Sequence, residues 1–206
     1  MTPTNSEIVT EPPDRHSLLW RFLVPFLLQI ILIASIPAQA VYTLVTGRTV
    51  VLQTQPVDPY DLLRGYSQTL SYEISQWETL QDLPGWEELS NRPEQLNEEF
   101  YLILEQPEEL TRDGIPVAWS AIAISAELPQ TLPSSQIALR GRFDRGQLIY
   151  GLETYYIPED RRDRINRDIA EAQQQEAQPF VVEIKVDRQG KAVPVRLCIK
   201  QKCDRF

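Results

Sequence analysis

Few residues of this chain have the type and placement that catalysis requires. Its only histidine, His16, precedes a long apolar run, so a serine–histidine–acid triad in the region after that run is excluded. A serine nucleophile with a desolvated lysine base remains open, with Ser67 as the nucleophile and Lys185 or Lys191 as the base. None of these residues lies in a motif that a serine–lysine enzyme requires. We therefore expect a protein without catalytic activity, and a serine–lysine hydrolase is the alternative.

The two cysteines, Cys198 and Cys203, lie close together in the sequence. In an oxidising compartment they could form a disulfide, which would close a short loop and contribute about 2 kcal/mol to stability. The alternative is two free thiols on a strand and its end. A zinc site needs further cysteine or histidine ligands, and the region after the apolar run has none. The glycines do not follow the spacing of a nucleotide-binding loop, so we expect neither a metal nor a cofactor.

The chain is acidic, with 29 acidic and 20 basic residues and a formal net charge of −9. This balance argues against a nucleic-acid partner, because phosphate binding needs a basic surface. Arg64, Arg140 and Arg142 stand beside glycines and could contact an anion or an acidic group of a partner through bidentate hydrogen bonds. The alternative is that they form salt bridges with the chain's own carboxylates.

The elements that must position these residues follow a run of apolar residues, 22–47, which carries no charge and is flanked by Arg21 and Arg48. A bilayer core of about 30 Å needs roughly 20 apolar helical residues, so the run predicts a transmembrane helix. We expect a disordered tail over 1–17, a membrane anchor over 18–47 and one domain over 48–206. The alternative is a signal peptide cleaved after the small residues Ala38-Gln39-Ala40.

The flanking charges give a weak guide to orientation, because Arg15 and Arg21 on one side face Arg48 and Arg64 on the other. We expect the N-terminus in the cytoplasm and the domain in the periplasm or an equivalent lumen. The run also contains polar residues, among them Gln29, which favour facing another helix over facing lipid. The expected partner is therefore another membrane protein.

After the anchor, short runs of alternating or β-branched residues predict an α+β domain with a mainly antiparallel sheet and one or two short helices. Predicted strands cover 69–75, 100–104, 116–125, 137–143, 147–150, 180–187 and 192–199, the last two forming a hairpin. Predicted helical segments cover 77–96, broken by Pro84-Gly85 and Pro93, and 161–175. Three tryptophans fall on apolar positions of these elements and are expected in the core: Trp77, Trp86 and Trp119.

Two blocks of sequence resemble the GDYXXLXY family of membrane-anchored bacterial proteins. In the first block, 56–74, Gly65, Leu70 and Tyr72 match the family motif, whereas Tyr66 stands at the motif's aspartate and Ser67 at its first tyrosine. The second block comprises 139–142 and 148–159. We interpret the three matching residues as determinants of the fold, and their shaping of a partner surface is the alternative.

The resemblance implies a small envelope protein of uncharacterised function that accompanies multi-pass membrane proteins. We therefore expect a single-pass accessory protein that supports the assembly or stability of another membrane protein. The layout of anchor, short extended segment and β-rich domain is also similar to that of signal-peptidase-like enzymes, which gives the serine–lysine alternative its context. A module that binds a small ligand in the envelope is a third possibility.

Overall fold

The computed structural model describes residues 15–55, 67–69, 71–90, 99–112, 114–144, 147–156, 180–199 and 202–205. The chain divides into two compact units, Met1–Gln39 and Ala40–Phe206. Several predictions lie outside the described residues: the helix over 161–175, the part of the tail before residue 15, and Arg64, Gly65 and Leu70.

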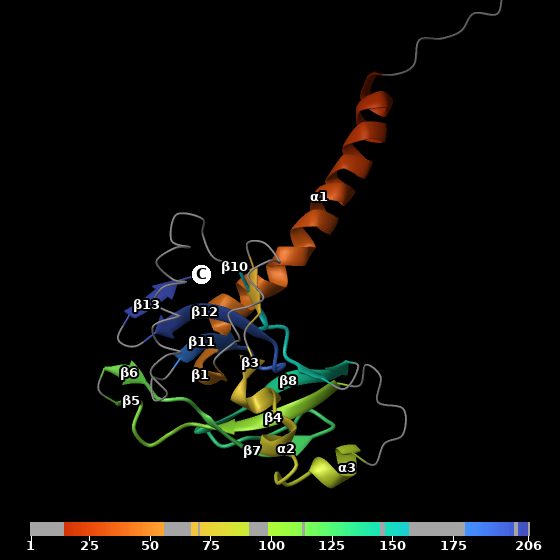
Figure 1. Cartoon of the computed structure of the whole chain (residues 1–206). Coiled ribbons are helices and arrows are strands. Elements are labelled where there is room, and N and C mark those ends of the chain that lie inside the picture. The colour runs from red at the N-terminus through yellow and green to blue at the C-terminus, as the bar shows by residue number, and fades with distance from the viewer. Residues whose placement is uncertain are drawn as a thin grey trace, which may run out of the picture. The chain divides into compact units, whose positions relative to one another are not determined.

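The first element is helix α1, Arg15–Thr46, coloured red to orange in Figure 1. Its stretch Trp20–Thr46 is long and apolar enough to cross a membrane, with a mean hydropathy of 2.0. Pro25 and Pro37 lie inside the helix and do not end it. Each proline removes one backbone hydrogen bond, a loss that membrane helices tolerate where neighbouring groups satisfy the freed carbonyl. The prediction of an N-terminal helix of membrane-spanning length is confirmed.

The larger sheet is antiparallel and has the strand order β13-β12-β11-β1-β3. Its strands are β1 (Arg48–Gln55), β3 (Ser71–Tyr72), β11 (Phe180–Val186), β12 (Ala192–Ile199) and β13 (Lys202–Arg205). At its centre, Val50 and Leu52 of β1 lie opposite Ile184 and Val182 of β11. Directly opposed residues of antiparallel strands share a face, and all four side chains are fully buried. They form the inner face of the sheet.

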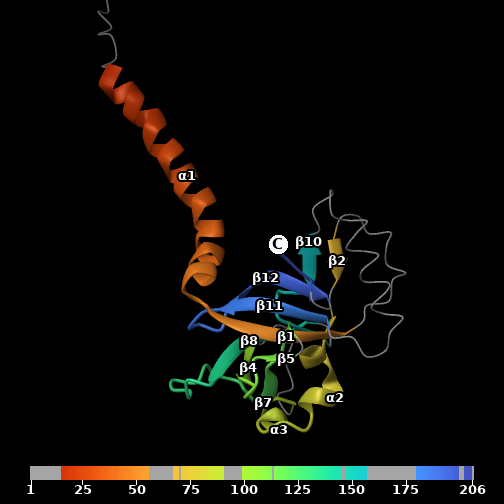
Figure 2. The same ribbon diagram turned by 90° about the vertical axis from the view of Figure 1, so that its left-hand side faces the viewer.

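The second sheet covers that inner face. Its order is β7-β4-β8-β9, and its strands are β4 (Glu99–Glu105), β7 (Ser120–Ser125), β8 (Gln136–Asp144) and β9 (Gln147–Ile149). Phe100, Leu102 and Leu104 of β4 are fully buried and belong to one hydrophobic cluster with the larger sheet. Figures 1 and 2 show the two sheets as two layers. Burying one apolar face of each sheet against the other is the main hydrophobic contribution to this fold.

Two small ribbons and three short helical segments complete the described chain. The ribbons pair β2 (Ser67–Thr69) with β10 (Thr154–Tyr156), and β5 (Thr111–Arg112) with β6 (Ile115–Pro116). The helical segments are the 3-10 helix η2 (Glu73–Ser75) and the α-helices α2 (Trp77–Leu80) and α3 (Trp86–Ser90). The predicted class, a long apolar helix followed by antiparallel sheets and a few short helices, is confirmed.

The strand predicted over 116–125 is wrong in its first half. The chain forms β6, leaves strand geometry over 117–119, and begins β7 only at Ser120. Backbone hydrogen bonds explain the break, because Val117 N donates to Leu110 O, and Trp119 N donates to Val51 O of β1 at 2.8 Å. This segment therefore runs from the β5–β6 ribbon past β1 of the larger sheet to β7 at the edge of the second sheet, and apolar composition alone could not reveal this path.

The strand predicted over 69–75 is also shorter than expected. Ser71 and Tyr72 form β3, but Glu73–Ser75 turn into η2 and bring Ile74 into the core. The helix predicted from Trp77 divides into α2 and α3, and its part beyond Ser90 lies outside the described residues.

The three tryptophans differ in burial. Trp119 is buried and Trp86 packs on the core, but Trp77 is 43% exposed, so the prediction that it lies in the core is wrong. Its ring makes an edge contact with the Trp86 ring, with centroids 5.0 Å apart. Leu80 is the buried residue of the short helix α2. Trp77 of the same helix contacts the rings of Trp86 and Phe143 while remaining partly exposed.

Candidate functional site

The two sequence blocks that carry the motif residues meet in the structure. Strand β2 of the first block pairs with β10 of the second, with Ser67 opposite Tyr156 and Thr69 opposite Thr154. The blocks are far apart in sequence, so this pairing is a long-range contact. Two tyrosines, one after β2 in the first block and one before β10 in the second, join the blocks further.

Each of these tyrosines donates a hydrogen bond to the backbone of the other block. The Tyr72 hydroxyl donates to Leu152 O at 2.8 Å, and the Tyr150 hydroxyl donates to Ile74 O at 2.7 Å. Both side chains are buried. We call this pair of tyrosines with their two acceptors the tyrosine brace. Buried polar groups need partners, and the brace satisfies two hydroxyls and two carbonyls at once.

The electrostatics of the brace keep both phenols neutral. Burial raises the pKa of Tyr72 and of Tyr150 above the ordinary value, and the nearby Glu153 carboxylate raises both further. Glu153 is held beside the brace because its Oε1 accepts a hydrogen bond from Tyr150 N at 2.5 Å. At neutral pH each hydroxyl is therefore a hydrogen-bond donor and is a poor candidate for a general base.

An aromatic cluster supports the brace from the second sheet. The Phe100 ring lies 5.8 Å from the Tyr150 ring and 4.9 Å from the Phe143 ring, measured between centroids. Phe100 is opposite Gly141 of β8, and a Cβ at Gly141 would come within 2.4 Å of Cζ of Phe100. A glycine in this part of the second block is therefore required by packing, since a side chain would displace the ring.

The comparison with protein families covers both blocks. The model of the family described as GDYXXLXY protein matches residues 29–197. The chain belongs to the GDYXXLXY family. No curated protein and no solved structure matches the chain. The match includes both strands of the β2–β10 ribbon and both tyrosines of the brace.

In this GDYXXLXY protein, Tyr72 is the one residue of the predicted motif set Gly65, Leu70 and Tyr72 that lies in the described part of the chain, and its hydroxyl forms half of the brace. Sequence reasoning missed Tyr150, the second tyrosine of the brace, and also Glu153, although both lie within the second block. The position of Tyr150 in the sequence carried no signal, because its hydroxyl binds a carbonyl 76 residues away. Glu153 matters only through its place beside that buried hydroxyl. The pairing of β2 with β10 was the fact needed to find them.

Two of the arginines that stand beside glycines, Arg140 and Arg142, lie on β8. Arg140 forms an ion pair with Glu99, and both side chains are partly exposed. Arg142 is exposed on β8, opposite Ile149 of β9, and makes no ion pair with any residue that the structure describes. Directions alternate along a strand, so Arg140 and Arg142 lie on one face of β8 and Gly141 on the other.

The residues of the serine–lysine alternative lie in different elements. Ser67 is in the β2–β10 ribbon, Lys185 is in β11 opposite Thr49, and Lys191 follows the turn between β11 and β12. Among the described residues, no group of three or more histidine, cysteine or acidic side chains could hold a metal ion.

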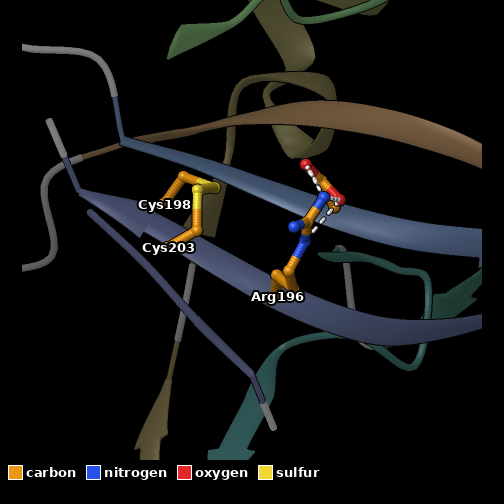
Figure 3. Close-up of a disulfide and its surroundings, with 4 residues drawn as sticks. Arg196, Cys198 and Cys203 are labelled. Atoms are coloured by element: carbon orange, nitrogen blue, oxygen red, sulfur yellow. Dashed lines mark hydrogen bonds and ion pairs between the residues drawn. A yellow bond between two sulfur atoms is a disulfide. The ribbon is translucent and has the colours of Figure 1, made fainter. Parts of the chain in front are cut away.

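The cysteines lie at the far edge of the larger sheet. Cys198 of β12 is directly opposite Cys203 of β13, and the two form a disulfide. Beside it, the Arg196 guanidinium binds the Glu183 carboxylate in a bidentate ion pair, with Nε to Oε2 and Nη2 to Oε1 both at 2.8 Å. Figure 3 shows the disulfide and the ion pair along the same strand. Glu183 is buried and Arg196 is half-buried, so the arginine compensates a charge that water reaches poorly.

Proposed function

We propose that this protein is a single-pass membrane-anchored accessory protein that binds a multi-pass membrane protein and supports its assembly or stability, without catalytic activity of its own. One observation carries the proposal: an apolar helix long enough to span a membrane leads into a domain whose motif tyrosine is engaged in bracing the fold. A domain braced in this way at the end of a membrane-spanning helix would suit a scaffold for a partner.

The helix itself offers a contact for the partner. Ser35 donates its hydroxyl to Leu32 O at 2.7 Å, so that polar group is satisfied within its own turn. Gln29 is exposed, and its amide makes no hydrogen bond with the part of the chain that the structure describes. An amide facing lipid is costly, and polar side chains in membranes favour contact with another helix. Gln29 is therefore the proposed contact with the partner's helix.

The test is affinity purification of the full chain from native membranes in a mild detergent, with a C-terminal tag. Mass spectrometry should recover a multi-pass protein at close to one copy per chain. Gln29→Leu should lower this recovery severalfold, because it removes the amide and leaves the helix apolar. Ser35→Ala is the matched control, since the hydroxyl it removes is satisfied internally. Recovery of the chain alone, or an equal effect of both substitutions, would refute the proposed partner contact.

The proposed topology places the N-terminus in the cytoplasm and the domain in the periplasm, or an equivalent lumen, of a bacterial envelope. The disulfide supports this side, because such bonds persist in oxidising compartments and are rare in the cytosol. Protease should digest the domain in cells whose outer barrier has been opened while the inner membrane stays sealed. Protection of the domain there would contradict the topology. The intact mass of the membrane-bound chain checks whether the anchor remains uncleaved.

A further inference from the structure

The apolar helix leads almost directly into β1, an inner strand of the larger sheet. Helix α1 ends at Thr46 and β1 begins at Arg48, so Gly47 alone separates them. Gly47 N donates to Thr43 O at 2.8 Å. A Cβ at Gly47 would come within 2.5 Å of Thr43 O and 3.0 Å of Val186 O. The last helical turn therefore lies directly against the end of β11, and all these residues belong to the unit Ala40–Phe206.

A buried hydrogen bond holds the turn between β11 and β12 beside this last helical turn. Thr43 is only 1% exposed, and its hydroxyl donates to Oδ2 of Asp187 at 2.7 Å. The other carboxylate oxygen of Asp187 accepts the backbone N–H groups of Gln189 and Lys191 at 2.9 and 3.0 Å. Figure 2 shows this turn next to the end of α1. The hydrogen bond therefore fixes the turn beside the last turn of α1.

Three cations gather at this junction: Arg48, Arg188 and Lys191, which we call the junction cations. Arg48 lies opposite Val186, the residue before Asp187, and its Nη1 donates to Gln136 O at 2.9 Å. Its guanidinium also lies 5.5 Å from the centre of the Trp119 ring. Arg188 is exposed and Lys191 half-buried, and neither makes an ion pair with a residue in the described ranges. The turn's one carboxylate, Asp187, uses both oxygens internally.

This gathering runs against the composition of the chain, whose net charge is −9. The contrast is sharpest with the segment 71–90, which contains five acidic residues and no lysine or arginine. The domain therefore has a cationic region where the apolar helix ends and an acidic region elsewhere. Arg48 also has the ring of Trp119 beneath it, and arginine over an aromatic ring is held in place while its remaining N–H groups stay available.

We propose that the junction cations bind the phosphate groups of lipids in the membrane that α1 crosses. The inference rests on the proposed insertion of α1, and it holds for either orientation because both leaflets carry phosphate. Basic residues beside a membrane helix are attracted to anionic lipids. The Thr43–Asp187 hydrogen bond gives the turn no freedom to withdraw, so Arg188 and Lys191 face the headgroups whenever the helix is inserted. Lipid contact would thus set the height of the domain above the membrane.

The test uses the full chain in nanodiscs of phosphatidylcholine alone or of phosphatidylcholine with phosphatidylglycerol. A fluorescent amino acid replaces Gln189 in the turn or, in a separate protein, Glu87 in α3, and a nitroxide on the lipid headgroup quenches it. We expect quenching severalfold stronger at 189 than at 87. We also expect thermal unfolding at a higher temperature in the anionic discs.

Two charge-reversed proteins complete the experiment. The turn variant, Arg188→Glu with Lys191→Glu, should abolish the dependence of the unfolding temperature on lipid charge. The control, Arg112→Glu with Arg142→Glu, alters two exposed strand residues and changes the net charge by the same amount. It should retain the dependence on lipid charge. Equal quenching at 189 and 87, or an unfolding temperature that neither lipid charge nor the turn variant changes, would overturn the proposal. The proposal would also be overturned if the turn were shielded in native membranes but not in nanodiscs, since a protein partner would then cover it. Carbonate extraction of the same samples reports separately whether α1 is inserted.

Discussion

The tyrosine brace and the edge of the larger sheet stabilise the domain by different means. The brace joins residues 80 and 76 positions apart through neutral, buried hydrogen bonds. The edge joins residues 13 and 5 positions apart through an ion pair and a disulfide, each with one member at least partly exposed. The brace exists only when both sheets are assembled, whereas the edge needs only neighbouring strands. Damage to the brace should therefore affect the whole domain, and damage to the edge should remain local.

Removing the Tyr72 ring should have the largest effect. Tyr72→Ala leaves a cavity in the core and an unpaired Leu152 carbonyl, so we expect a loss of about 4 kcal/mol in the free energy of unfolding. Tyr72→Phe keeps the ring and loses the hydrogen bond alone, at about 1 to 2 kcal/mol. Chemical denaturation of the full chain in detergent measures both. A smaller loss for Tyr72→Ala than for removal of the disulfide would reverse the ranking of the two regions.

High pH should weaken the brace next. Burial raises the pKa of both brace phenols in the folded state, so unfolded chains release these protons first as the pH rises. Stability is unaffected below about pH 10, the ordinary value for tyrosine, and decreases above it by about 1.4 kcal/mol per pH unit for each phenol.

The control for this alkaline effect is the double variant Tyr72→Phe with Tyr150→Phe. It starts from a lower stability, but its stability should fall less steeply between pH 10 and 11. Unfolding curves measured across this interval give the slopes. Equal slopes for the two proteins would show that the brace phenols do not titrate as buried groups.

Loss of the disulfide should have a smaller and local effect. Cys198→Ala with Cys203→Ser removes a short covalent loop, at about 2 kcal/mol. Strand β13 should then lose most of its protection, because the disulfide ties this edge strand to β12. Amide hydrogen exchange should show fast exchange in β13 and unchanged protection in β4. Loss of protection in both strands would mean that the edge, like the brace, supports the whole domain.

The smallest effect is expected at the partly exposed ion pair between Arg140 and Glu99. Arg140→Gln should change stability by less than about 0.5 kcal/mol, because water screens such pairs. Arg196→Gln is the informative comparison, since it leaves the buried Glu183 charge without its partner and should cost clearly more. Thermal unfolding of the two variants measures the difference, and equal losses would argue against a special role for burial.

The hairpin of β11 and β12 shows how far the sequence could lead. Two alternating apolar runs around Arg188-Gln189-Gly190 predicted it, and its strands lie where they were expected. Its register was not predictable. Ile184 lies opposite Pro194, but the next pair is Glu183 with Arg196, so Val195 is an extra residue. This bulge places the arginine across from the buried glutamate, and an unbulged hairpin would place Val195 there.

The sequence by itself determined the apolar helix, the family, most of the strands and the proximity of the two cysteines. These features depend on composition and on short periodic patterns, which act within a few residues of the chain. Only the tertiary structure decided that Tyr72 and Tyr150 bind each other's blocks, that Trp77 lies outside the core, and that Thr43 meets Asp187. Such contacts depend on which strands become neighbours and in which register, because a shift of one residue turns every side chain of a strand to the opposite face.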